Sequence, residues 1–85
     1  MKKEIIMIYS SGCPQCKVMR ETIAESINLN NVDADLREYD CECADAIDVA
    51  IEYGIEGLPG CSIDGVVVEG EGFSPSEIKT LISKL

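Results

Sequence analysis

The chain is 85 residues long, which is typical of a single domain, and we expect residues 1–85 to form one. Hydrophobic residues make up 46% of it and aromatic residues only 5%, so we expect a globular protein with a mainly aliphatic core. Sixteen acidic and seven basic residues give a formal net charge of −9. This charge opposes binding to nucleic acid and to anionic membranes, so we expect neither as a partner.

The N-terminal segment and the cysteine content predict the compartment. Lys2 and Lys3 precede a short apolar run, but no small-residue cleavage site follows, so a strand is predicted here rather than a signal peptide. No stretch approaches the roughly 18 apolar residues that cross a bilayer. Five cysteines, an odd number, are a poor basis for a secreted disulfide framework. We therefore expect a protein of the reducing cytoplasm. We also expect it to be a monomer.

The first part of the chain predicts a strand, a helix and a second strand. The apolar run over residues 3–9 predicts a strand buried on both faces. Pro14 suits the first turn of a helix, and apolar residues recur at helical spacing over residues 14–27, until Asn30 and Asn31 stop the helix. Apolar and charged residues alternate over residues 32–37, which predicts a half-buried strand at a sheet edge.

A second helix is expected to follow, with Asp40 as its N-terminal cap and Gly54 as its left-handed C-terminal residue. The buried stripe predicted for it consists of Ala44, Ile47, Ala50 and Ile51. Acidic residues are concentrated around this helix, with Arg37 as the single base between Asp33 and Glu56. They predict either a solvated face or a docking surface for a basic partner.

The last third of the chain predicts a hairpin and a third helix. Asp64-Gly65 is a strong signal for a two-residue turn between antiparallel strands at residues 58–63 and 66–69. Ser74, Pro75 and Glu77 predict a capped helix start. The buried face expected for this helix consists of Ile78, Leu81, Ile82 and Leu85. The order β-α-β-α-β-β-α predicts an α/β fold, a four-stranded mixed sheet with helices on both faces.

Cys13-Pro14-Gln15-Cys16 lies between the first strand and the first helix, where a Cys-x-x-Cys pair becomes a redox motif. Unpaired amides and the helix dipole stabilise a thiolate at Cys13, which is the expected nucleophile. Cys16, one turn further along, is expected to attack the mixed disulfide on Cys13 and release the reduced product. Lys17 either adds positive potential or simply lies on the helix surface. The alternative for the pair is a zinc half-site or two inert core thiols, which the absence of histidine disfavours.

The motif and the chain as a whole resemble the thioredoxin and glutaredoxin superfamily. Ser11-Gly12-Cys13-Pro14-Gln15-Cys16 is similar to a glutaredoxin active-site segment, and Gly57-Leu58-Pro59 lies where the family keeps a cis-proline. The resemblance implies a thioredoxin fold, a cis Pro59 beside the dithiol and a Leu58 backbone that pairs with an extended substrate. It also implies substrate contacts at Pro14, Gln15, Leu58 and Gly72, with no cofactor and no resident metal.

Other residues show which groups within this superfamily the chain resembles and where it departs from them. Gly72-Phe73-Ser74-Pro75 resembles the Gly-Phe-x-Pro element of the redoxins that reduce ribonucleotide reductase, and the chain is similar to the very small thioredoxin-like proteins of methanogenic archaea. Ser10 occupies the place where glutaredoxins often carry a basic residue for a glutathione carboxylate. The tryptophan and the buried acid of thioredoxins are also missing, and Met7 stands at the position of that acid.

The expected function is therefore reduction of protein disulfides, with electrons delivered to cytoplasmic enzymes such as ribonucleotide reductase. A flavin- or ferredoxin-linked reductase of the thioredoxin type is the expected electron source. Glutathione is a disfavoured reductant, because it carries two carboxylates and the net charge of this protein is −9.

Three further cysteines lie outside the motif. Cys61 is expected to point inward from a strand as a small apolar residue. Cys41 and Cys43 lie at the start of the second helix, where the dipole and the nearby carboxylates have opposite effects on a thiolate. The sequence leaves four interpretations of this pair open: incidental thiols, a second redox pair, soft-metal ligands or a contact for a thiolate partner. The alternative function is accordingly a metal carrier, with Cys13, Cys16, Cys41 and Cys43 as ligands.

Overall fold

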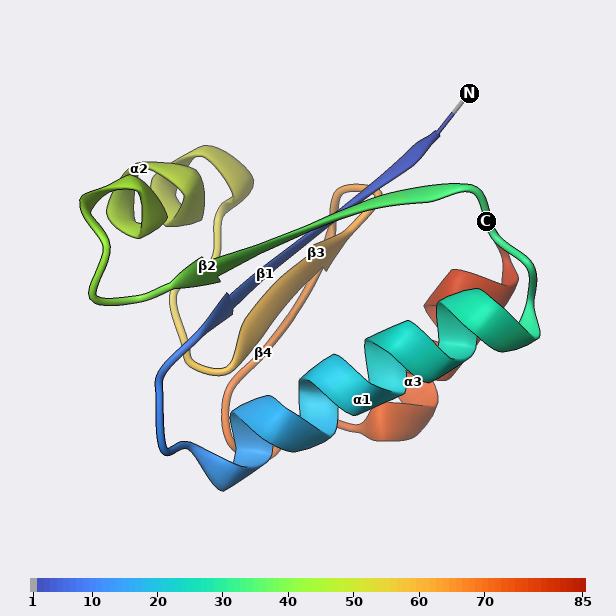
Figure 1. Cartoon of the computed structure of the whole chain (residues 1–85), viewed down its shortest axis with the longest axis horizontal. Coiled ribbons are helices and arrows are strands. Elements are labelled where there is room, and N and C mark those ends of the chain that lie inside the picture. The colour runs from blue at the N-terminus through green and yellow to red at the C-terminus, as the bar shows by residue number, and fades with distance from the viewer. Residues whose placement is uncertain (1) are drawn as a thin grey trace.

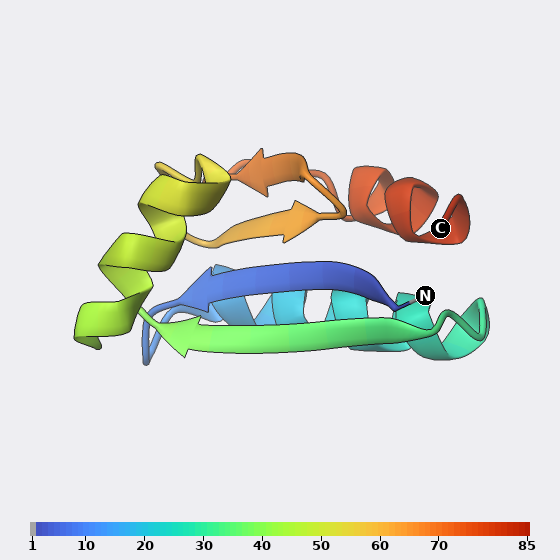
Figure 2. The same ribbon diagram turned by 90° about the horizontal axis from the view of Figure 1, so that it is seen from above.

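The computed structural model describes residues 2–85, which form one mixed sheet and three helices (Figure 1). The elements in chain order are β1 (Lys3–Tyr9), α1 (Pro14–Leu29), β2 (Ala34–Asp40), α2 (Ala44–Tyr53), β3 (Gly60–Ile63), β4 (Val66–Glu69) and α3 (Pro75–Ser83). The sheet has four strands in the order β2-β1-β3-β4, which Figure 2 shows from above. β1 is parallel to β2 and antiparallel to β3, and β4 is antiparallel to β3. This is the predicted thioredoxin fold, with the second strand at the sheet edge.

β1 lies at the centre of the core because its side chains are buried on both faces of the sheet. Ile5 and Met7 pack on the face covered by α1 and α3, whereas Ile6 and Ile8 face α2. The larger cluster is completed by fully buried residues of these two helices, Met19, Ile23, Ile78 and Ile82. α1 and α3 lie side by side in Figure 1, and α2 crosses the end of the sheet where β1 and β2 finish (Figure 2). Helices therefore cover both faces, as predicted.

The first helix and the second strand are longer than the sequence predicts. α1 continues to Leu29, and Asn30 is its C-cap. The backbone N–H of Asn30 (3.1 Å) and its side-chain amide (2.8 Å) both donate to the carbonyl of Ser26 in the last turn. β2 runs over Ala34–Asp40 rather than residues 32–37, because its parallel pairing with β1 continues as far as Tyr9.

The start of α2 differs from the prediction. The helix begins at Ala44, with Cys43 as its N-cap, and Asp40 is not the cap. Asp40 instead accepts a hydrogen bond of 3.0 Å from the N–H of Glu42 in the turn that precedes the helix. Gly54 ends α2 in the left-handed conformation (φ 75°), as predicted.

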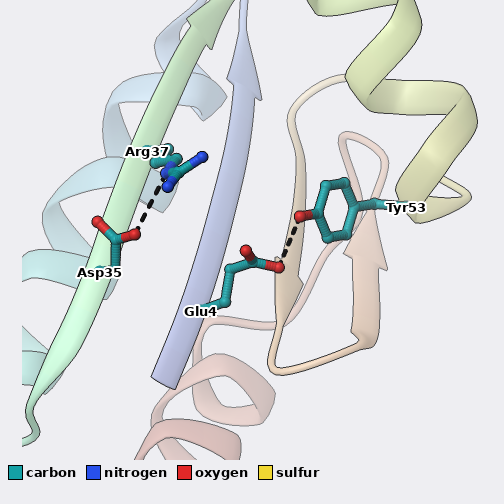
Figure 3. A network of polar contacts seen from close by, with 4 residues as sticks. All are labelled: Glu4, Asp35, Arg37 and Tyr53. Atoms are coloured by element: carbon teal, nitrogen blue, oxygen red, sulfur yellow. Dashed lines mark hydrogen bonds and ion pairs between the residues drawn. The ribbon is translucent and has the colours of Figure 1, made fainter. Parts of the chain in front are cut away.

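The buried face of α2 is also different from the predicted one. Ile47 and Ile51 are 62% and 76% exposed, while Ala46, at 2% exposed, packs on the sheet. The Tyr53 hydroxyl donates a 2.6 Å hydrogen bond to the Glu4 carboxylate and ties the end of α2 to β1 (Figure 3). This hydrogen bond, together with desolvation, raises the pKa of Tyr53 to about 12. The prediction that Ala44, Ile47 and Ile51 belong to the core is therefore wrong, because all three are exposed.

The hairpin has the predicted turn but a shorter first strand. β3 begins at Gly60 rather than at residue 58, because its pairing with β1 starts opposite Ile8. Asp64 and Gly65 have φ values of 51° and 96°, which a two-residue turn between twisted antiparallel strands requires.

α3 begins at Pro75 with Ser74 as its N-cap, but the predicted side-chain capping bond is not formed. The N–H groups of Glu77 and Ile78 instead bond to the backbone carbonyl of Ser74. Ile78 and Ile82 are fully buried, and Leu81 and Leu85 are half-buried beside them, as predicted. Among residues 2–85, no helix is long and apolar enough to cross a membrane.

Candidate active site

Cys13 is the N-cap of α1 and lies at the point where the chain leaves β1 for the helix. Its backbone is extended (φ −90°, ψ 112°), and Pro14 follows it in the first helical turn. The Cys13 Sγ atom accepts a hydrogen bond of 3.1 Å from the N–H of Cys16. The Cys13 side chain is partly exposed. A helix-start N–H therefore points at an accessible sulfur.

Cys16 has a different environment. It is 2% exposed and packs in the cluster between α1, α3 and the sheet. Burial, and next a hydrogen bond between the side chains of Cys16 and Cys13, raises the pKa of the Cys16 thiol. Its Sγ atom accepts a hydrogen bond of 3.4 Å from the N–H of Ser10. The pair thus combines an accessible sulfur with a buried, protonated one.

The Leu58-Pro59 segment lies next to the end of β1, from which the chain leads to this pair. The Leu58–Pro59 peptide bond is cis, as the resemblance implied. Gly60 pairs with Ile8 at the last position of the β1–β3 ladder, so Pro59 comes next to the end of β1 and the Ser10 amide that bonds to Cys16. Among the residues described, neither the N–H nor the C=O of Leu58 has a hydrogen-bond partner. Both groups are therefore free to pair with an extended chain.

A surface hollow of about 520 Å³ opens beside the dithiol; we call it the dithiol hollow. It is lined by residues 9–14 together with Cys16, Lys17 and Arg20. Lys17 lies at its rim and forms only a loose ion pair with Glu21, at 4.0 Å. Pro14 and Lys17, both predicted site residues, are therefore at this surface.

Arg20 and Tyr9 were not among the predicted site residues. The Arg20 guanidinium lies over the Tyr9 ring, 5.1 Å from its centroid, and makes a 2.7 Å ion pair with Glu38 of β2. The available signal was the spacing, since Arg20 is four residues after Cys16 on the same helix. This cation already has a carboxylate and an aromatic face as partners.

Two predicted substrate contacts lie outside the dithiol hollow. Gln15 is exposed in the first turn of α1 but does not line it. Gly72 is exposed in the segment between β4 and α3 and lines neither this hollow nor the one beside Leu58 that is described below.

The remaining cysteines are not brought together with the dithiol. The Cys41 N–H donates to the Tyr9 carbonyl at 2.7 Å, and its side chain packs in the cluster on the α2 face, whereas Cys16 belongs to the other cluster. The two thiols are near enough that, after burial as the main cause, the charge of Cys41 also contributes to raising the pKa of Cys16. Cys43 is exposed. Cys61 is fully buried, as predicted, and burial raises its pKa to about 12. Over residues 2–85 no group of three or more His, Cys, Asp or Glu side chains is arranged to hold a metal ion, so the four-cysteine set is not assembled.

Comparison with known proteins identifies the family of this chain. The model of the thioredoxin domain family matches residues 2–83. The chain belongs to the thioredoxin family. A thioredoxin from the methanogen Methanothermobacter thermautotrophicus is 30% identical over 79 residues, which cover 92% of this chain and 96% of that protein.

Solved structures of other thioredoxins share the fold. Thioredoxin O2 from Arabidopsis thaliana superposes with a TM-score of 0.77 and 15% identity, covering 99% of this chain and 75% of the other. A thioredoxin-like protein from Clostridium perfringens has a TM-score of 0.76 and 21% identity, covering 99% and 71% of the two chains. Family membership makes this chain a thioredoxin-like redox protein, and thiol-disulfide oxidoreduction is the general activity of that family.

Proposed function

We propose that this thioredoxin-family protein reduces protein disulfides through Cys13 as the nucleophile and Cys16 as the resolving thiol. The Cys13 thiolate attacks one sulfur of the substrate disulfide, so that a mixed disulfide forms and one substrate thiolate leaves. Cys16 then loses its proton and attacks the Cys13 sulfur, and the second substrate thiolate leaves. The substrate gains two electrons, and the protein ends with a Cys13–Cys16 disulfide.

The observation that carries this proposal is the asymmetry of the two sulfurs. Cys13 is accessible and accepts the N–H of Cys16 at the start of α1, whereas Cys16 is buried with a raised pKa. An accessible thiolate suits the first attack, and a protonated thiol nearby does not compete with it.

The Leu58-Pro59 segment supports protein chains as substrates. Its free backbone groups offer one N–H and one C=O to an extended segment, which gives a strand-like contact independent of side-chain identity. Further substrate contacts that we propose are Pro14 and Lys17, which line the dithiol hollow, and Gln15 and Gly72, which are exposed but do not line it.

We further propose a single-domain monomer that works in the cytoplasm. Its electrons come from a flavin- or ferredoxin-linked reductase of the thioredoxin type and go to enzymes such as ribonucleotide reductase. The similarity to the thioredoxin of a methanogen supports a reductase of the thioredoxin type as the electron source. The resemblance of Gly72-Phe73-Ser74-Pro75 to the redoxins of ribonucleotide reductase supports that enzyme as an electron acceptor.

The alternative function, a metal carrier, has less support. It requires the thiols of Cys41 and Cys43 to join those of Cys13 and Cys16, but within residues 2–85 no three His, Cys, Asp or Glu side chains are arranged to hold a metal ion. A metal carrier should retain stoichiometric Zn²⁺ or Cu⁺ through desalting, whereas disulfide reduction by Cys13 and Cys16 requires no bound metal.

The test is reduction of insulin disulfides with dithiothreitol as the electron source. We expect turnover by the wild-type protein and none by the Cys13→Ser variant. Cys43→Ser is the matched control, because it removes an exposed thiol at the start of a different helix. Wild-type turnover by Cys13→Ser, or stoichiometric metal retained by a wild-type protein that reduces nothing, would contradict the proposal.

A further inference from the structure

A second hollow lies on the α2 face of the sheet, next to the Leu58-Pro59 segment; we call it the α2 hollow. Its volume is about 160 Å³, and apolar side chains dominate its lining, among them Ile8, Ala46, Ile47, Ile55 and Leu58. An apolar cavity of about 150 Å³ accommodates a molecule of the size of benzene. The α2 hollow is therefore large enough for one bulky apolar side chain.

The exposed side of α2 extends this apolar surface. Ile47 and Ile51 are four residues apart, so they lie on one face of the helix, and they are 62% and 76% exposed. Leu58, which borders the same hollow, is 38% exposed. Ile47 and Leu58 both line the hollow, and Ile51 lies one helical turn beyond Ile47. The protein itself leaves all three side chains partly uncovered.

The segment that carries this surface contains acidic residues and no basic ones. No lysine or arginine occurs between Arg37 and Lys79. Asp48 and Glu52 are exposed, each next in sequence to one of the two isoleucines, and Glu56 lines the hollow.

Internal ion pairs do not neutralise these carboxylates. The ion pairs within residues 2–85 are Lys17–Glu21, Arg20–Glu38 and Arg37–Asp35, the last of which lies along β2 in Figure 3. The carboxylates beside Ile47 and Ile51 thus remain available to an external cation.

The position of Leu58 joins this surface to the dithiol. Its free backbone groups lie beside the end of β1, and its side chain lines the α2 hollow. Side chains of an extended segment alternate between two faces. A segment that pairs with Leu58 and places its cysteine at Cys13 therefore directs a neighbouring side chain to the α2 side.

We propose that the α2 hollow and the acidic surface around Ile47 and Ile51 select the substrate: a protein segment with a bulky apolar residue and a lysine or arginine within a few positions of its disulfide cysteine. The apolar side chain fills the α2 hollow, and the cation lies beside Asp48 and Glu52. This inference rests on the proposed reduction of protein disulfides by Cys13 and Cys16 and adds no chemical step to it.

The test uses four peptides, each joined by a disulfide from its cysteine to the same reporter thiol. Two positions within three residues of the cysteine are varied: one carries leucine or serine, and the other carries lysine or glutamate. We expect kcat/KM for the leucine-lysine peptide to exceed that for the serine-glutamate peptide by about a hundredfold at low ionic strength, from about tenfold for each feature. In 0.5 M NaCl the lysine preference should largely disappear, whereas the leucine preference should remain.

Variants assign each preference to its surface. Ile47→Ser with Ile51→Ser should reduce the leucine-to-serine ratio to near one, and Leu29→Ser, a 77% exposed leucine at the end of α1, is the matched control. Asp48→Asn with Glu52→Gln should reduce the ratio of kcat/KM for the lysine peptide to that for the glutamate peptide to near one. Glu25→Gln, which removes an exposed acid on α1, is the control. Because each readout is a ratio for one variant, a general loss of activity does not affect it.

The possible failures are distinct. Equal reduction of all four peptides, or ratios unchanged in the two double variants, overturns the selection by the α2 hollow and leaves the proposed function intact. A wild-type protein that reduces neither the peptides nor 2-hydroxyethyl disulfide overturns the proposed function and this inference together.

Discussion

The Glu69 carboxylate accepts a hydrogen bond of 2.9 Å from the backbone N–H of Gly57. The same oxygen accepts the N–H of Glu56 at 2.5 Å, and the next residue of the chain, Gly70, donates its N–H to the carbonyl of Pro59 at 2.9 Å. The end of β4 thus holds the loop that carries Leu58 and Pro59 to the dithiol.

Replacing Glu69 should therefore weaken substrate binding without touching the sulfurs. A hydrogen bond to a charged group contributes about 1.5–3 kcal/mol, and less when exposed, so we expect Glu69→Ala to lower kcat/KM for insulin about tenfold. Glu69→Gln keeps an acceptor and should lose less. The control is Glu71→Ala, an exposed acid two residues further along, and the rate of Cys13 alkylation by iodoacetamide should not change in any of the three variants.

Gly60 has no room for a side chain. A Cβ atom there would lie 2.6 Å from the carbonyl oxygen of Gly57 and would overlap the side chain of Ile55. Because one of these contacts is with backbone, the loop must shift, and we expect Gly60→Ala to destabilise the fold by about 2 kcal/mol in urea unfolding. A Cβ at Gly72 meets no atom within 4 Å, so an equal loss in Gly72→Ala would contradict this explanation.

The roles of the two active-site sulfurs predict opposite results for their serine variants. Cys16→Ser should accumulate a covalent mixed disulfide between Cys13 and substrate, visible by non-reducing electrophoresis and mass spectrometry, because no resolving thiol remains. Cys13→Ser should neither trap nor reduce substrate. A trapped adduct on Cys16 in the Cys13→Ser variant would reverse the assignment.

The Tyr53–Glu4 hydrogen bond predicts a pH dependence of stability. The pKa of Tyr53 is raised from the ordinary value of 10.0 to about 12, so the folded state favours the protonated phenol. Its stabilising effect should be fully present below pH 10 and be lost as the pH rises from 10 to about 12. We expect Tyr53→Phe to be less stable than the wild type at pH 8, and the difference to disappear near pH 12. Absorbance at 295 nm should show a late-titrating tyrosine that this variant lacks.

Glutathione should be a poor reductant for this protein. Ser10 donates a backbone N–H to Cys16 but offers no charge to a glutathione carboxylate, and Arg20 is paired with Glu38. The loss of one charge-assisted contact costs about 1.5–3 kcal/mol, or about ten- to a hundredfold in affinity. The measurement compares kcat/KM with glutathione plus its reductase against a flavin-linked thioredoxin reductase system. Equal or higher kcat/KM with glutathione would contradict this prediction and show that glutathione is an effective reductant of the protein.

Local sequence determined the dithiol and the elements around it. The apolar run before Ser10, the proline after Cys13 and the helical spacing that follows are all short-range signals, and they place the motif at a strand-helix junction. The hairpin at Asp64-Gly65 is equally local, since its two positive φ values are a property of those two residues. The cis Leu58–Pro59 bond was reached by resemblance, not by local physics.

Only the tertiary structure decided which face of α2 is buried and what holds the Leu58-Pro59 loop. Two faces of this ten-residue helix have apolar residues at helical spacing, one with Ala46, Ala50 and Tyr53 and the other with Ile47 and Ile51. The sequence of the helix is therefore compatible with burial of either face. The hydrogen bond from Tyr53 to Glu4 and the packing of Ala46 on β1 decide between them, and both join residues more than 35 positions apart. The contact between Glu69 and Gly57 likewise exists only once β3 and β4 have paired, because no pattern within either segment encodes it.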